Sequence, residues 1–203
     1  MKFHQSFGPL IGSPSKLALL RTFFRYPSKH WTGRELGRVS GVSPAQTIRD
    51  LAEFAAAGFV DRKVVGRAHV WWVNVDHALV QTLGPLFEAE GSSLQVLLED
   101  IQLGLRGAPF VEARVFGSIV RGDERADSDI DLYVRVRNSA DRQVIEARLE
   151  AVRQKLWKKY GNALSPIVYT DKDARNPPNP LLLDAIAREG IPIRPEGVRL
   201  GAD

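Results

Sequence analysis

The sequence predicts an α+β protein, and three observations support this prediction. Residues 32–58 contain two short helices with capping residues at their starts. Residues 59–75 form two strand-like segments on either side of a Gly-Arg pair, which is typical of a β-hairpin. Further along, two apolar strand-like runs, 111–116 and 130–136, flank a Gly-Ser turn and a pair of aspartates.

The composition is that of an ordinary soluble protein. The 203 residues are enough for two small domains, and the net charge of +4 is too small to indicate nucleic-acid binding by itself. The chain contains no cysteine, which excludes disulfides and thiolate metal sites. No apolar run approaches the ~20 residues that a membrane span needs, so we expect a cytoplasmic protein without membrane association.

The chain begins with an expected loose arm, residues 1–14, which contains two prolines and two glycines. A helix is expected from Ser15 because apolar side chains recur at helical spacing up to Phe24. It should end at Tyr26, because the residue before a proline resists the α conformation.

Two capped helices follow. Thr32 to Glu35 reads as a capping box opening a helix that Gly41 ends. Ser43 to Gln46 reads as a second capping box, with a proline at the first helical position. The helix that it opens runs to Gly58. Its inward-facing residues are expected to be Ile48, Leu51 and Phe54. Two helices joined by a few residues form a helix-turn-helix arrangement.

Two strands, 59–65 and 68–75, then form the hairpin, with Trp71 and Trp72 on opposite faces. Three helices followed by a hairpin resemble the winged helix-turn-helix domain of MarR-like and ArsR-like bacterial regulators, over residues 15–75. The resemblance implies binding of double-stranded DNA, with the second helix of the motif in the major groove and the hairpin as a wing.

The residues that the resemblance places against DNA lie on the second helix and on the wing. They are Ser43, Gln46, Thr47, Arg49, Arg62, Lys63, Arg67 and His69. The alternative is a protein interaction platform, because the helix carries Asp50 and Glu53 and only one arginine.

Residues 76–107 are expected to form a helical linker, with two helices joined at Gly91. Leucines and an isoleucine between 94 and 105 make one apolar stripe that should pack against the flanking domains. Winged-helix proteins often dimerise through such helices, so a homodimer is a further hypothesis.

The next stretch contains the chemistry. Asp129 and Asp131 stand two apart, so in an extended strand both side chains project to the same side. Such a pair, completed by substrate phosphates and water, suits Mg²⁺. Gly117 allows the backbone to approach a phosphate, Ser118 adds a hydroxyl, and Arg121 follows one helical turn later. A calcium-binding EF-hand is excluded, because its required Gly and Glu are replaced by Leu132 and Asn138.

The arrangement of Gly117-Ser118, ten residues, and Asp129-Ile130-Asp131 resembles the signature of the minimal nucleotidyltransferases of the polymerase-beta-like superfamily. The resemblance covers about residues 108–195 and implies a mixed sheet with flanking helices. It implies that Asp129 and Asp131 are catalytic and hold Mg²⁺. It implies that Gly117, Ser118, Arg121 and Ser128 hold the nucleotide.

Members of this family commonly carry a third carboxylate on a later strand. The matching strand is predicted at 163–169, and the matching position holds Ser165. Asp171 and Asp173 lie just beyond it, and the sequence leaves open whether either reaches the metal. Around this strand we expect a helix at 141–160, a proline-rich break, a helix at 181–188, and an edge strand from Ile191.

These observations lead to three hypotheses. The first is a DNA-binding nucleotidyltransferase that moves AMP from ATP to a hydroxyl of a macromolecule. The family resemblance adds a toxin protein or an RNA as acceptor, in a toxin–antitoxin pair. The second is a transcriptional regulator that senses nucleotide without turning it over, and the third is a transferase acting on small molecules of the aminoglycoside type.

Overall fold

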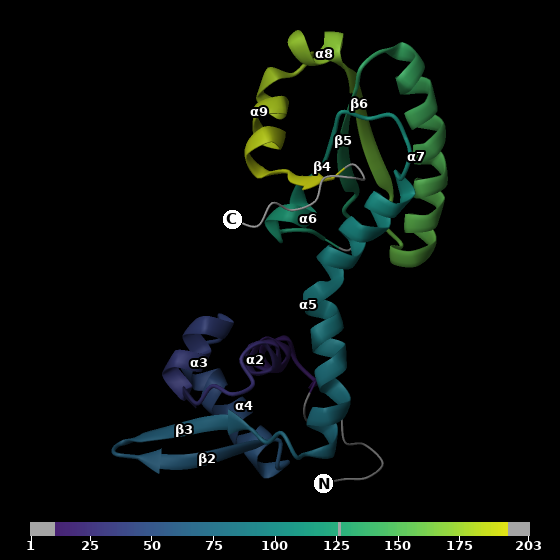
Figure 1. Ribbon diagram of the computed structural model, residues 1–203. Coiled ribbons are helices and arrows are strands. Elements are labelled where there is room, and N and C mark those ends of the chain that lie inside the picture. Colours follow the sequence, from purple (N-terminus) through teal and green to yellow (C-terminus); the bar gives the residue numbers. More distant parts are fainter. Residues whose placement is uncertain (1–10, 126, 195–203) are drawn as a thin grey trace, which may run out of the picture. The chain divides into compact units, whose positions relative to one another are not determined.

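The computed structural model describes residues 11–125 and 127–194 (Figure 1). The chain divides into two compact units, residues 1–92 and 93–203. The α+β fold class is confirmed, since helices and two separate sheets make up the described residues.

The described part of the first unit contains a group of helices, a three-stranded antiparallel sheet and the beginning of a long helix that continues into the second unit. The helices are α2 (Pro14–Arg25), α3 (Gly33–Ser40) and α4 (Pro44–Ala56). The strands β1 (Trp31–Thr32), β2 (Val60–Val65) and β3 (Ala68–Val73) lie in the order β1-β3-β2. Figure 1 shows the β2–β3 hairpin extending away from the helices.

Capping residues fix the helix starts in this unit. The side chains of Ser13, Thr32 and Ser43 each accept a hydrogen bond from a backbone N–H three residues on. Gly41 ends α3 with a φ of 68°, a conformation that favours glycine. The expectation of a loose arm is wrong at its described end, because Pro14 occupies the first turn of α2, where a proline loses no hydrogen bond.

The first unit's core is built by residues from all of its elements. Leu51 and Phe54 of α4 and Trp31 of β1 are fully buried. Trp71 is buried while Trp72 stacks on His30, so the two tryptophans do point to opposite faces. The expected inward position of Ile48 is wrong, since that side chain is 52% exposed.

Helix α5 (Ala78–Gly104) is continuous, so the expected break at Gly91 is wrong. A glycine inside a helix costs only about 1 kcal/mol relative to alanine, which a long helix packed at both ends tolerates. The boundary between the two units falls inside this helix, after Ser92. Leu97, Ile101 and Leu105 pack into the core of the second unit.

The second unit is built on a mixed sheet in the order β6-β5-β4-β7. The strands are β4 (Glu112–Phe116), β5 (Ile130–Val136), β6 (Leu164–Thr170) and β7 (Ile191–Ile193). β5 and β6 are parallel, and the other pairs are antiparallel. The helices are α6 (Ser118–Arg121), α7 (Ser139–Tyr160), α8 (Asp171–Arg175) and α9 (Pro180–Glu189). The expected edge strand from Ile191 is confirmed as β7, whereas α8 and β1 were not expected.

The two faces of this sheet differ because side chains alternate along each strand. On one face Ile130, Leu132 and Val134 are buried in a core shared with α5 and α7. On the other face lie Asp131 and Arg135. In Figure 1, α7 and α9 lie on opposite sides of β5 and β6. The second face therefore meets α9, and it carries the polar residues.

Candidate functional site

The predicted Gly-Ser turn brings α6 directly against the aspartate strand. Phe116 pairs with Asp131 across β4 and β5, so Gly117 follows immediately beside that carboxylate. Gly117 has a φ of 82°, which side chains rarely tolerate. A Cβ at this position would overlap Asp131 Oδ2 and lie 3.1 Å from Asp131 Cγ. The site therefore needs glycine for two reasons, backbone conformation and space.

The aspartate pair is electrostatically strained. Partial burial raises the pKa of Asp131, repulsion by the Asp129 carboxylate raises it further, and the Arg121 guanidinium opposes both effects. Asp129 directly precedes β5 and is exposed. The two carboxylates are thus close enough to influence each other, as their spacing predicted, and a cation beside them would relieve the repulsion.

Most of the predicted nucleotide-binding residues line one pocket of about 340 Å³. Gly117, Ser118, Arg121 and Asp131 line it from α6 and β5. The opposite wall comes from α9, through Leu182, Ala185 and Glu189. Their spacing puts these three side chains on one face of the helix. Sequence reasoning missed this wall, because nothing in the glycine-serine and aspartate signature indicates a helix sixty residues further on.

Arg121 is held by two carboxylates. Its Nε donates to Asp123 Oδ2 at 3.2 Å, and its Nη1 lies 4.0 Å from Glu189 Oε2. The arginine side chain is half exposed at the pocket, so it is placed to contact an anion there.

Ser128 does not line this pocket. Its hydroxyl accepts a hydrogen bond from the Arg125 N–H at 2.8 Å, and its carbonyl accepts one from Asn162 Nδ2 at 2.9 Å. The Ile130 N–H donates to the Ala163 carbonyl at 2.7 Å. The backbone on both sides of Asp129 is therefore tied to the loop between α7 and β6.

The structure answers the question of the third carboxylate. Ser165 pairs directly with Asp131 across β5 and β6, so it occupies the neighbouring position that the resemblance indicated. Asp171 and Asp173 follow Thr170, which pairs with Val136, five residues along β5 from Asp131. That separation is roughly 17 Å along the strand. Neither aspartate belongs to the Asp131 site.

Both distant aspartates have structural partners. Arg135 Nη1 donates to Asp171 Oδ1 at 2.8 Å. Asp173 and Thr170 form a capping box at the start of α8, which lowers the pKa of Asp173 through hydrogen bonds from the Thr170 N–H and hydroxyl.

The residues present fit a magnesium ion coordinated mainly by its substrate. Within residues 11–125 and 127–194, no three His, Cys, Asp or Glu residues are grouped as metal ligands. Asp129 and Asp131 supply two oxygen ligands, and Mg²⁺ is usually bound by one or two carboxylates with phosphates and waters. Such a donor set is compatible with a metal–nucleotide complex.

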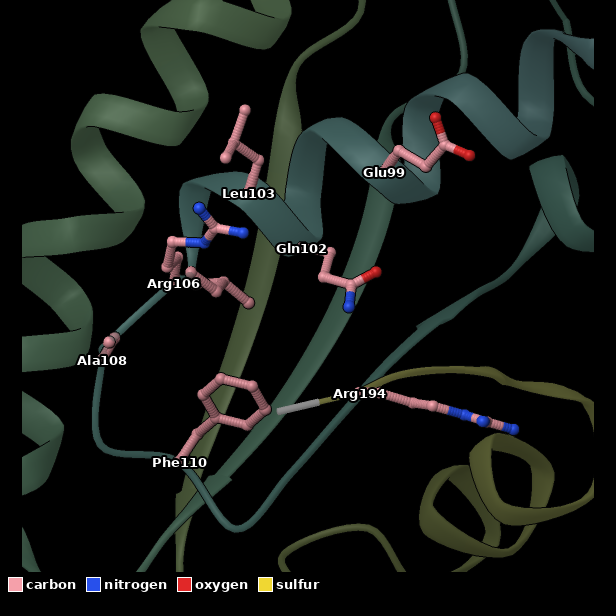
Figure 2. A pocket seen from close by; sticks show the side chains of 9 residues that line it. Glu99, Gln102, Leu103, Arg106, Ala108, Phe110 and Arg194 are labelled. Atoms are coloured by element: carbon pink, nitrogen blue, oxygen red, sulfur yellow. The ribbon is translucent and has the colours of Figure 1, made fainter. Parts of the chain in front are cut away.

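A second pocket, of about 470 Å³ (Figure 2), shares no lining residue with the Asp131 pocket. It is lined from the end of α5, the loop before β4 and Arg194, which follows β7. The Val111 N–H donates a hydrogen bond to the Arg135 carbonyl on β5. The loop therefore joins β4 at the end of that strand that is farther from Gly117. None of the predicted site residues lines it.

The predicted DNA-contacting residues of α4 are only partly available. Arg49 is exposed and Ser43 caps the helix. Gln46 is engaged on both sides, donating to Asp50 at 2.8 Å and accepting from Arg49 at 2.5 Å. Thr47 is fully buried and donates to the Ser43 carbonyl, so its predicted place at the DNA is contradicted.

The acidic residues that argued against DNA are largely accounted for. Asp50 is 1% exposed and bound by Gln46, and Glu53 is paired with Lys16 at 2.5 Å. On the hairpin Arg62, Lys63 and Arg67 are exposed, as is His69. Arg62 lies 5.7 Å from the Trp71 ring. The protruding hairpin thus presents a basic surface.

A comparison with known protein families gives a match over the second unit. The family described as nucleotidyltransferase domain matches residues 106–191, a range that contains every residue lining the Asp131 pocket. Residues 106–191 are therefore similar to nucleotidyltransferase domains. No curated protein matches this chain. None of the described helices is long and apolar enough to cross a membrane.

Two solved structures are similar to parts of the chain. NolR from Sinorhizobium fredii is 19% identical, covers 42% of this chain and 82% of its own, and has a TM-score of 0.36. A possible transcriptional regulator from Methanosarcina mazei Go1 is 9% identical. The match covers 49% of this chain and 88% of the regulator, with a TM-score of 0.33. These TM-scores are too low to establish a shared fold.

Proposed function

We propose that the second unit is a Mg²⁺-dependent nucleotidyltransferase that moves AMP from ATP to a hydroxyl of a macromolecule, releasing pyrophosphate. The observation that carries this proposal is the pocket in which Gly117, Ser118, Arg121 and Asp131 meet, within the residues similar to nucleotidyltransferase domains. A magnesium ion held by Asp129 and Asp131 would neutralise charge on the phosphates and the leaving pyrophosphate.

The chain's own residues do the rest of the binding. Gly117 lets the backbone approach the triphosphate, and the Ser118 hydroxyl donates to a phosphate oxygen. Arg121 leaves Asp123 and Glu189 to contact the phosphates, where its positive charge stabilises the developing negative charge.

A labelling assay tests the reaction. Full-length protein is incubated with Mg²⁺, host-cell lysate and ATP labelled at the α-phosphate, with Asp129→Asn, Asp131→Asn as the inactive control. A labelled lysate component that is lost with the control supports transfer and reveals the acceptor. Pyrophosphate formation without labelled product would instead indicate simple hydrolysis.

We further propose that the first unit binds double-stranded DNA through Arg49 and the basic hairpin. A DNA-binding unit joined to a transferase suits an antitoxin that modifies its toxin and represses its own operon. Purification from the native host tests this role, and a protein always isolated without a partner would contradict it.

A specific observation favours a second candidate, a regulator that senses nucleotide. Ser165 stands beside Asp131 where a carboxylate would complete the metal site. Such a regulator binds ATP, changes its DNA affinity and forms no pyrophosphate. Ser165→Asp would restore the missing carboxylate and should tighten Mn²⁺ binding, measured by calorimetry. If ATP leaves the DNA affinity of the wild-type protein unchanged, the sensor hypothesis is ruled out.

A further inference from the structure

We propose that Glu189 accepts the proton of the acceptor hydroxyl during transfer, so that α9 supplies the carboxylate that β6 lacks. This inference rests on the proposed transferase function. It concerns a residue outside the aspartate signature, reached only through the fold.

The reaction needs a proton acceptor besides the metal ligands. Asp129 and Asp131 serve the metal, and a serine hydroxyl at 165 is too weak a base for this role. Asp171 and Asp173 lie at the other end of the sheet. Among the residues that line the pocket, the carboxylates are Asp131 and Glu189.

Glu189 lines the pocket in which we place the nucleotide phosphates. It is the last residue of α9 and lines the same pocket as Ser118 and Asp131. Its Oε2 is 4.0 Å from Arg121 Nη1, so its carboxylate is next to the proposed position of the phosphates. The side chain is 37% exposed, which leaves it accessible to an acceptor that arrives from solvent.

Glu189 is also not committed to metal binding. In the described parts of the chain it forms no metal-ligand group with the aspartates. The charged groups that face it are Arg188 on its own helix, at 2.8 Å, Arg121 on α6, and Asp131 across the pocket.

The step balances without a further reactant. The acceptor oxygen forms a bond to the α-phosphorus as its proton passes to the Glu189 carboxylate. The bond from the α-phosphorus to the oxygen bridging the β-phosphate breaks, and pyrophosphate leaves with that electron pair. Glu189 then returns the proton to water.

The test compares full-length wild type, Glu189→Gln and the control Asp184→Asn, which removes an exposed carboxylate from α9 outside the pocket. The rate of label transfer from α-labelled ATP to lysate is measured with Mg²⁺. The affinity for α,β-methylene ATP with Mg²⁺ is measured by calorimetry. Glu189→Gln should lower the transfer rate by roughly 10²- to 10⁴-fold and leave the affinity within about threefold.

Three results would overturn the inference. A Glu189→Gln variant that keeps more than a tenth of the wild-type rate shows that Glu189 is not the base. A variant whose nucleotide affinity falls as far as its rate assigns Glu189 to nucleotide binding instead. If wild type itself transfers no label, both the proposed function and this inference fail. If wild type transfers label and only the Glu189→Gln result is wrong, this inference fails alone.

Discussion

At the residue scale, the site depends on the contact between Gly117 and Asp131. Gly117→Ala would place a methyl group on the Asp131 carboxylate and force an unfavourable φ. We predict at least a tenfold loss of affinity for a fluorescent ATP analogue with Mg²⁺, which corresponds to about 1.4 kcal/mol or more.

The matched control is Gly122→Ala. Gly122 also has a positive φ, 73°, but a Cβ there meets nothing within 4 Å. This variant carries only the backbone strain, of about 1 kcal/mol, and should keep nucleotide affinity within a few-fold. Equal loss of affinity in both variants would show that backbone strain, and not the Asp131 contact, explains the effect.

A second residue-scale prediction concerns the charge of Asp131. Burial and Asp129 raise the pKa of this carboxyl, so its ionised form destabilises the metal-free folded protein. Asp131→Asn should therefore melt at higher temperature than wild type at pH 7 without metal. The difference should shrink as the pH falls, because wild-type Asp131 gains its proton in acid and recovers that stability.

Circular dichroism melts at several pH values measure this effect, with exposed Asp184→Asn as control. Asp131→Asn should also lose the Mg²⁺-dependent rise in melting temperature that wild type shows. A metal-free Asp131→Asn protein that is less stable than wild type at pH 7 would contradict the electrostatic account.

At the element scale, the continuity of α5 has a direct consequence. Gly91 lies inside the helix without a positive φ, and a Cβ there meets no atom within 4 Å. Gly91→Ala should raise the free energy of unfolding by about 0.5–1 kcal/mol, measured by urea denaturation. If the chain instead turned at Gly91, alanine would lower stability.

We predict that the loop between α7 and β6 positions Asp129. Asn162 binds the Ser128 carbonyl beside Asp129, so Asn162→Ala should weaken Mn²⁺ binding several-fold, measured by calorimetry. Asn138→Ala is the control, because it removes the cap of α7 and costs about 1 kcal/mol of stability elsewhere. Equal metal affinity in Asn162→Ala and wild type would show that Asp129 is held by other contacts.

At the scale of the whole molecule, the basic hairpin and the Asp131 pocket belong to different units. Replacing Lys63 and Arg67 with alanine should weaken DNA binding uniformly across sequences. The slope of log affinity against log salt should fall by about 2, because each substitution leaves one DNA phosphate without its cation. Fluorescence anisotropy with a labelled duplex at several salt concentrations measures this slope.

The control removes the same charge from the second unit, through Arg148 and Lys158 on the exposed side of α7. It should leave the slope unchanged. If both double variants change it equally, DNA binding follows net charge and the hairpin has no special role.

The sequence by itself determined the features that depend on short spacing along the chain. Helix caps, the hairpin, the Gly-Ser turn and the proximity of Asp129 to Asp131 all follow from residues only a few positions apart. Local hydrogen bonds and side-chain alternation fix these features, so they could be predicted before any fold was known. The mixed sheet followed through the family resemblance.

Only the tertiary structure decided which distant segments meet. It removed Asp171 and Asp173 from the site, buried Thr47, and brought Glu189 of α9 into the pocket. These positions depend on strand register and on which apolar faces pack together. Those are long-range choices governed by burial across the whole unit, and local spacing along the chain does not encode them.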